Sequence, residues 1–252
     1  APNHNYIVHN SECRLPDYIR KYKFHAIILG ATFLCTRGHP NIFPETLNEY
    51  DFIRNSDAFK IAMPQDEYYC NTILDEWMCG WGIDLVYTVA PKNWSVLYPK
   101  YIKTKGKIML GYTGYVSDEM IKRWANPKHH NDRPIDVSYR SHRHHANYGQ
   151  LGFIKAYIGE LFKHKFAGRN LVLDISTDSS DMIPGNNWYD FVENSKFCIT
   201  VNSSNNLIDP YGDIKRRVNE YQQRYPHAQY KDIQQQCYPG IDGRYDFTCI
   251  SP

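Results

Sequence analysis

RPIDVSYRSHRHHANYGQLGFIKAYIGELFKHKFAGRNLVLDIS (residues 133–176) alternates the pattern of a strand with the pattern of a helix. The run 134–140 is rich in β-forming residues, and the segment that Gly149 opens and Gly168 closes carries apolar side chains at helical spacing. A second strand follows at 170–175, and the chain then continues into a short helix at 188–192 and a third strand at 197–202. Strands and helices in this order predict a parallel sheet covered by helices.

The part of the chain before residue 133 shows the same alternation. Buried strands are predicted at 25–29, 58–63 and 83–89, and a fourth strand at 107–110. The segment 69–79 has room for a helix, and Ser117 is expected to cap a further one. The sequence therefore predicts an α/β protein with βα repeats in both halves.

Two domains are predicted, because the chain has 252 residues and single domains usually have roughly 100 to 150. The polar, proline-flanked segment 126–134 interrupts every periodic pattern. It is interpreted as a linker between an N-terminal Rossmann-like domain (1–125) and a C-terminal one (135–252), with a ligand cleft between them. Since the chain stops just after a strand-like run at 245–250 and begins at Ala rather than Met, both domains are expected to be incomplete.

Composition excludes several classes of protein. The chain holds 29 basic and 27 acidic side chains without a basic half, so duplex nucleic acid is not an expected partner. Seven cysteines, an odd number without paired CxxC spacing, favour reduced thiols and a cytoplasmic location. The longest apolar run, 26–35, is far shorter than the roughly 18 residues of a membrane span, and no signal peptide is visible.

The first candidate site residues are Asp66 and Glu67, which follow the predicted strand 58–63. Open α/β sheets bind ligands at the carboxyl ends of their strands, so these carboxylates stand where a site is expected. Either one could take a proton from an acceptor hydroxyl. The alternative is that both acids simply occupy the first turn of the next helix.

Arg140 and the glycine pair Gly149 and Gly152 form the second candidate. A guanidinium at the end of a strand, followed by free amides at a helix amino end, matches the needs of an anionic diphosphate. The alternative for Arg140 is a surface ion pair. Because the spacing of the glycines is not GxGxxG, neither a nicotinamide nor a flavin cofactor is expected, and no other cofactor is predicted.

A third polar segment, 202–206, contains Ser203 and Ser204 and follows the last predicted strand of this half. Hydroxyl and amide groups there could hold phosphate or sugar oxygens, although the same residues also form plain turns. The histidines at 129, 130, 142, 144 and 145 lack the spacing of known ligand motifs, so no metal site is predicted.

Several of these stretches, taken in order, resemble bacterial GT-B glycosyltransferases of the family 1-like, or CgeB-like, group. The resemblance extends over nearly the whole chain and is carried by residues 65–68, 82–84, 111–116, 133–140, 174–176 and 209–214. It implies two Rossmann-like domains whose parallel sheets face a cleft, the first binding an acceptor and the second a nucleotide-sugar donor. It also implies that Arg140, Gly149 and Gly152 contact the donor diphosphate, and that Ser203 and Ser204 lie in a donor-side loop.

This chain departs from the pattern of that group at two places. Relatives tend to carry a glycine-rich, acidic loop where this chain has Asn202, Asn205 and Asn206. They also continue past the equivalent of Pro252 into an acidic motif that is expected to hold the donor ribose. Both departures put the affinity for the donor in question.

The function implied is transfer of a sugar from a nucleotide-diphosphate donor to an acceptor hydroxyl, in the synthesis of a surface polysaccharide or glycan. A lipid-linked acceptor would place the enzyme peripherally at a membrane. Asp66 or Glu67 is the expected base. Two alternatives stay open: a GT-B-like sugar-nucleotide epimerase or hydrolase, which acts without an acceptor, and a catalytically inactive module that binds carbohydrate or nucleotide.

Overall fold

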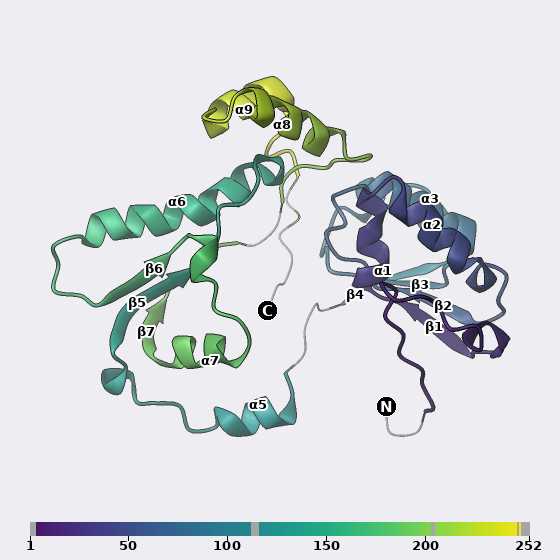
Figure 1. Ribbon diagram of the computed structural model, residues 1–252, viewed down its shortest axis with the longest axis horizontal. Helices are drawn as coiled ribbons and strands as arrows, with labels where there is room; N and C mark the ends of the chain where they lie inside the picture. Colours follow the sequence, from purple (N-terminus) through teal and green to yellow (C-terminus); the bar gives the residue numbers. More distant parts are fainter. Residues whose placement is uncertain (1–3, 112–115, 203–204, 246, 248–252) are drawn as a thin grey trace. The chain divides into compact units, whose positions relative to one another are not determined.

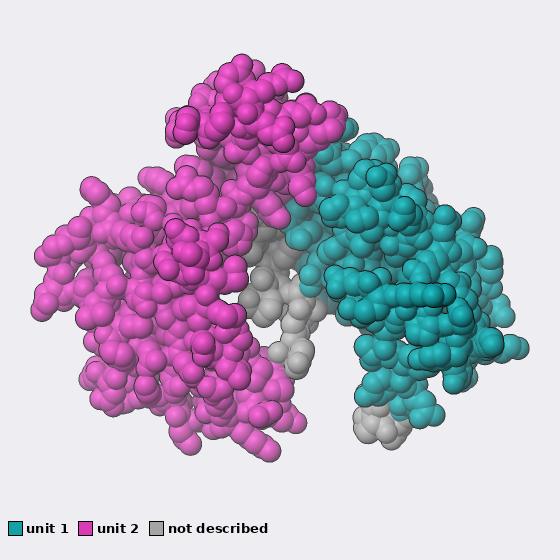
Figure 2. Space-filling model, viewed as in Figure 1, with its two compact units in different colours: residues 1–113, 208–213 teal, residues 114–207, 214–252 magenta. Residues whose placement is uncertain are grey.

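The computed structural model describes residues 4–111, 116–202, 205–245 and 247, and it is an α/β protein with two parallel sheets. The chain forms two compact units, shown in different colours in Figure 2. Unit 1 comprises residues 1–113 together with 208–213, and unit 2 comprises residues 114–207 together with 214–252. The prediction of an α/β fold with parallel strands in both halves is confirmed.

Unit 1 is built on a four-stranded parallel sheet in the order β1-β2-β3-β4. Its strands are β1 (Ala26–Leu29), β2 (Phe59–Ala62), β3 (Leu85–Thr88) and β4 (Lys107–Leu110). Its helices are α1 (Ala31–Cys35), α2 (Ile42–Glu49), α3 (Asn71–Trp81) and α4 (Trp94–Leu97). The strands lie side by side in chain order, and crossovers between parallel strands are right-handed. The connecting helices therefore lie on one face of the sheet, where Figure 1 shows α1, α2 and α3.

The core of unit 1 lies between these helices and the sheet and is largely aromatic. Phe33 packs edge-on against Tyr50 at 5.3 Å, and Trp77 lies 5.4 Å from Trp81 between ring centroids. All four side chains are buried. Aromatic pairs in tilted or edge-on arrangements contribute beyond the area they bury, so this cluster holds α1 and α3 together.

Unit 2 is built on a three-stranded parallel sheet in the order β6-β5-β7. The strands are β5 (Ile135–Arg140), β6 (Leu173–Ser176) and β7 (Ser195–Cys198), and the helices beside them are α5 (Asp118–Arg123), α6 (Gly149–Phe166) and α7 (Asn186–Glu193). Successive strand residues point to opposite faces. The Tyr139 hydroxyl donates to a carbonyl of α6 at 2.7 Å, whereas Arg140 lies 4.6 Å from the ring of Phe191 in α7. The two helices therefore cover opposite faces of the sheet (Figure 1).

Two further helices, α8 (Asp213–Arg224) and α9 (Tyr230–Cys237), complete unit 2. The residues that form their shared core are Leu207, Ile214, Val218, Ile233, Cys237 and Tyr238. The Tyr238 hydroxyl donates to the Ala146 carbonyl at 2.7 Å, which ties this helix pair to the loop that leads into α6. Short 3₁₀ turns join the other elements at Ile19–Lys21, Thr36–Gly38, Asp51–Ile53, Tyr101–Lys103, His130–Asp132, Ala146–Tyr148 and Ser179–Asp181.

The division between the units differs from the predicted one. Segment 126–134, interpreted as a linker, packs on α7, because the Lys128 amide donates to Glu193 and the Arg133 guanidinium donates to the Ser195 carbonyl. Helix α5, predicted to belong to the first domain, pairs with α7 through Arg123 and Asp190 at 2.6 Å. The first unit therefore ends at residue 113 rather than 125.

Two strand bounds also differ from the prediction. β6 spans 173–176 instead of 170–175, and β7 spans 195–198 instead of 197–202. Backbone pairing with β5 sets the bounds of both strands: Arg140 pairs with Ser176 and Ile135 pairs with Ser195. The side-chain pattern of the sequence does not predict where such pairing begins and ends. The strand-like run 245–250 lies mostly outside the described residues. None of the helices in the described residues has the length and apolar character required to cross a bilayer.

Candidate functional site

The loop that carries Asp66 and Glu67 is held by Arg37, a residue that sequence reasoning did not single out. Arg37 follows α1 and is 2% exposed. Its guanidinium donates to four backbone carbonyls, those of Leu34 (2.8 Å), Gln65 (2.8 Å), Asp66 (2.6 Å) and Tyr69 (3.0 Å). A planar cation with several fixed donors suits this task, and it fixes the main chain between β2 and α3.

Glu67 lies in the interior of unit 1 and is 2% exposed. One carboxylate oxygen accepts from the backbone amides of Val89 (3.1 Å) and Ala90 (3.2 Å), and the other accepts from the hydroxyl of the fully buried Tyr98. Burial raises the pKa of Glu67 above 4.5, although these hydrogen bonds and one from Thr88 oppose the rise. The side chain fixes the end of β3 and has no path to an acceptor molecule.

Asp66 is exposed, and its backbone has a φ of 50°. Its carboxylate accepts from the hydroxyl of the buried Tyr68 at 2.6 Å. Positive φ values are uncommon in residues other than glycine, and such a conformation persists only when the surrounding structure holds it. Here the hydrogen bond from Arg37 to the Asp66 carbonyl holds it. Of the two predicted acids, Asp66 is the one that solvent and a substrate can reach.

Arg140 stands at the carboxyl end of β5, as predicted, but its side chain is engaged within unit 2. The guanidinium forms an ion pair with Asp174 at 2.7 Å and donates to the carbonyls of Tyr139, Asp174 and Asp181. It also stacks on Phe191, and the side chain is 15% exposed. Because it lies on the sheet face opposite α6, the structure does not bring it to the side of the sheet where Gly149 and α6 lie.

The amino end of α6 begins at Gly149 in a conformation that suits only glycine. Its φ is 67° and its ψ is −160°, a region that side-chain-bearing residues avoid. A Cβ atom there would lie 2.3 Å from Asn206 Oδ1 and 2.8 Å from Asp242 Oδ1. The side chain of Asn206 is therefore in direct contact with the helix end, and within the described residues its buried Oδ1 has no hydrogen-bond partner.

Asp242 supplies the negative charge that the first turn of α6 lacks. That turn contains no acidic residue, and the Gln150 amide donates to Asp242 Oδ1 at 3.2 Å. The other carboxylate oxygen accepts from the Tyr230 hydroxyl and from the Gln234 amide at 3.0 Å. Since helix amino ends attract anions, a carboxylate from a distant turn lies where a phosphate group could also bind. We call Gly149, Gln150, Asn206, Tyr230 and Asp242 the α6 cluster.

The other predicted donor residues are placed differently. A Cβ at Gly152 would lie 2.5 Å from Tyr148 Cβ, so this glycine permits close packing of α6 on the preceding loop. Ser203 and Ser204 lie outside the described residues. The neighbouring Asn205 donates to the Asn147 carbonyl at 3.2 Å and thereby fixes the chain just before Asn206.

Replacing Gly149 with alanine is expected to lower the free energy of unfolding by about 2 to 4 kcal/mol, because the new Cβ adds backbone strain to an overlap with buried polar atoms. Gly80 in α3 is the matched control, since a Cβ there meets nothing within 4 Å. Gly80→Ala is expected to stabilise by about 0.5 to 1 kcal/mol. Urea unfolding followed by circular dichroism checks both; equal effects at the two positions would contradict this account of Gly149.

The rings of His142 and His144, which precede the α6 cluster, are tilted against each other with centroids 4.2 Å apart. Burial lowers the pKa of His144 to about 4, so it is neutral near pH 7. No group of three His, Cys, Asp or Glu side chains in the described part of the chain is placed to hold a metal ion.

The fold defines the class of protein as an α/β protein with two parallel sheets, and the α6 cluster gathers polar side chains beyond the carboxyl edge of the second sheet. Comparison of the chain with family models, curated proteins and solved structures gave no match.

Proposed function

We propose that the protein is a glycosyltransferase that moves a sugar from a nucleotide-diphosphate donor to an acceptor hydroxyl during synthesis of a surface polysaccharide or glycan. In this proposal the two units are the Rossmann-like domains of a GT-B enzyme, and unit 2 binds the donor. The observation that carries it is the α6 cluster, in which the amino end of an 18-residue helix meets an anion and an unpartnered buried amide oxygen.

The donor diphosphate would take the place of the Asp242 carboxylate at the first amides of α6, where the helix dipole and the backbone N–H groups favour negative charge. Gly149 allows the side chains of Asn206 and Asp242 to approach the helix end closely, because a Cβ there would overlap with both. The helix dipole and the backbone N–H groups there would stabilise the charge that develops on the leaving group. Asp66, exposed at the end of β2, is the proposed base toward the acceptor hydroxyl.

A second candidate function is binding of a nucleotide sugar without turnover. It is favoured by the placement of Glu67, whose carboxylate is enclosed and paired with two amides and a hydroxyl. Only Asp66 then remains as a base of the two predicted acids. Product analysis with and without added acceptor distinguishes the two candidates and also detects hydrolysis or epimerisation of the donor.

The donor site can be tested by labelling two amides. Tyr148–Gly149 and Tyr211–Gly212 are the Tyr-Gly pairs of the sequence. Protein labelled with ¹³C-carbonyl tyrosine and ¹⁵N-glycine therefore selects Gly149, in the α6 cluster, and Gly212, in unit 1, as an internal reference. Titration uses UDP-, GDP- and dTDP-sugars, which carry a diphosphate, and a CMP-sugar, which carries a single phosphate, for comparison.

We expect one nucleotide sugar to shift the Gly149 amide more than the Gly212 amide, while its free nucleoside leaves Gly149 unchanged, because the diphosphate makes the contact. Inorganic pyrophosphate should compete with that shift. If no nucleotide sugar moves Gly149, or if the nucleoside alone moves it equally, the donor site is not at α6.

A further inference from the structure

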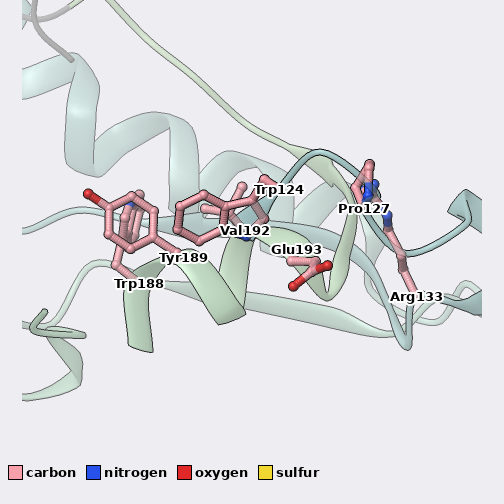
Figure 3. A pocket seen from close by; sticks show the side chains of 7 residues that line it. All are labelled: Trp124, Pro127, Arg133, Trp188, Tyr189, Val192 and Glu193. Carbon is pink, nitrogen blue, oxygen red and sulfur yellow. The ribbon is translucent and has the colours of Figure 1, made fainter. Parts of the chain in front are cut away.

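A concave site lies in unit 2, away from the α6 cluster. It has a volume of about 380 Å³ and is lined by Trp124, Pro127, Arg133, Trp188, Tyr189, Val192 and Glu193 (Figure 3). Arg133 comes just before β5, and Glu193 ends α7 just before β7. The strands are parallel, so this aromatic pocket is at the amino edge of the sheet, whereas α6 starts beyond the carboxyl edge.

The aromatic side chains of the pocket gather at one end, and the charged side chains lie toward the other (Figure 3). Trp124 and Tyr189 lie 4.7 Å apart between ring centroids, and Trp188 is 39% exposed. Val192 separates these rings from Glu193 in the same view. The pocket therefore presents ring faces next to a carboxylate and a guanidinium.

The walls of the pocket are fixed to each other by hydrogen bonds. Arg123 pairs with Asp190 at 2.6 Å, which joins α5 to α7. Lys128 joins the segment after α5 to the end of α7, because its amide donates to Glu193 Oε1 at 3.3 Å. Arg133 donates to the carbonyls of Lys128 and Ser195. A pocket that is formed before binding loses less conformational entropy when a ligand enters.

Several donors and an acceptor of the pocket residues are not used in hydrogen bonds within the described part of the protein. Arg133 uses three of its five N–H donors on carbonyls, which leaves two. Among the contacts of the described residues, Glu193 Oε2, the Tyr189 hydroxyl and the Trp188 indole N–H have no protein partner. The pocket thus offers an acceptor and several donors beside its aromatic faces.

We infer that the aromatic pocket binds a saccharide. A pyranose ring has an apolar C–H face that packs on an aromatic ring and a rim of hydroxyls that both donate and accept hydrogen bonds. Glu193 would accept from hydroxyls, and Arg133 would donate to them. A proline-rich peptide, the other usual ligand of aromatic grooves, offers carbonyl acceptors but few donors, so it would cover Glu193 Oε2 without giving it a hydrogen bond.

The inference goes beyond the proposed transfer reaction, because the pocket stands at the other edge of the sheet and does not depend on donor binding. Its expected ligand is a segment of a glycan chain rather than the sugar of a nucleotide donor. Such a site would hold a polymer on the protein and raise its local concentration.

Saturation-transfer NMR tests the inference with maltotriose, cellotriose, triacetylchitotriose and mannotriose, each at about 10 mM, which suits millimolar affinity. We expect saturation on the ring C–H protons of at least one of them. Trp188→Ala removes a ring face, and Glu193→Gln removes the charged acceptor while keeping its shape. Each change is expected to raise Kd about tenfold.

Tyr157→Ala is the matched control, since Tyr157 is an exposed aromatic residue of unit 2 on α6 and outside the pocket. It should leave saccharide binding unchanged. The inference is overturned if none of the four saccharides receives saturation, or if Kd is unchanged in both Trp188→Ala and Glu193→Gln. The Gly149 amide shift with nucleotide sugars should survive in both variants, so failure of one site is distinguishable from failure of the other.

Discussion

Arg37→Ala is expected to lower the free energy of unfolding of unit 1 by about 3 to 5 kcal/mol, because it leaves four carbonyl groups without their buried donor. The loop 65–69 would lose the contacts that fix it, and Asp66 would lose the support of its positive φ. Urea unfolding followed by tryptophan fluorescence checks the effect, since Trp77 and Trp81 lie in the core of this unit.

Arg54→Ala is the control, because it removes an arginine side chain without removing buried hydrogen bonds. Arg54 is exposed, and its backbone carbonyl, which accepts from Lys60, is kept in alanine. A change within about 0.5 kcal/mol is expected there. Equal destabilisation by the two substitutions would show that the four carbonyl contacts of Arg37 do not matter to stability.

Glu67→Ala is expected to destabilise unit 1 by about 3 to 5 kcal/mol, whereas Glu67→Gln is expected to stay folded. Alanine removes the buried acceptor that the amides of Val89 and Ala90 and the Tyr98 hydroxyl share, and leaves the Ala90 amide only the Thr88 hydroxyl at 3.1 Å. Glutamine keeps an oxygen for the two amides and places an NH₂ group where it can donate to the Tyr98 oxygen. If the two variants were equally unstable, the charge of the carboxylate rather than its hydrogen bonds would be the stabilising feature.

Glu67 also predicts how stability depends on pH. Burial raises its pKa above 4.5, so the folded protein binds the proton more tightly than the unfolded chain does. Its contribution is then fully present below pH 4.5 and is lost as pH rises from 4.5 through the folded-state pKa. The stability of the wild type relative to Glu67→Gln should fall in that window, by at most about 1.4 kcal/mol per pH unit.

Urea unfolding at a series of pH values measures this difference, with Glu12→Gln, an exposed substitution, as control. The control measures the effect of removing a carboxylate that is not buried. A difference between wild type and Glu67→Gln that does not change with pH would mean that Glu67 is ionised throughout, and a difference that grows with pH would reverse the sign of the proposed pKa shift.

Two helices that were not predicted, α8 and α9, nevertheless have recognisable sequence patterns. Helix α8 is strongly polar, but Ile214, Val218 and Tyr221 recur on one face at helical spacing, and the first two are buried. Helix α9 begins with a capping box between Gln229 and Asp232. Both helices were therefore accessible from the sequence, although neither was predicted.

The placement of the candidate site residues carried no such signal. Glu67 and Asp66 are neighbours in the chain, yet one is enclosed and the other is exposed. Asp242 reaches the amino end of α6 from 92 positions further along the chain. No local pattern links residues at that separation, because their contact depends on how α9 packs beside α6.

The sequence by itself determined the α/β class, the parallel strands of both halves and the start of α6 at Gly149, because side-chain periodicity and glycine conformation act within a few residues. The tertiary structure alone decided that Arg140 faces α7, that Arg37 holds the loop of Asp66, and that an aromatic pocket forms at the amino edge of the second sheet. The physical reason is that burial, ion pairing and pockets arise from packing between distant segments, and the same local sequence is compatible with several such packings.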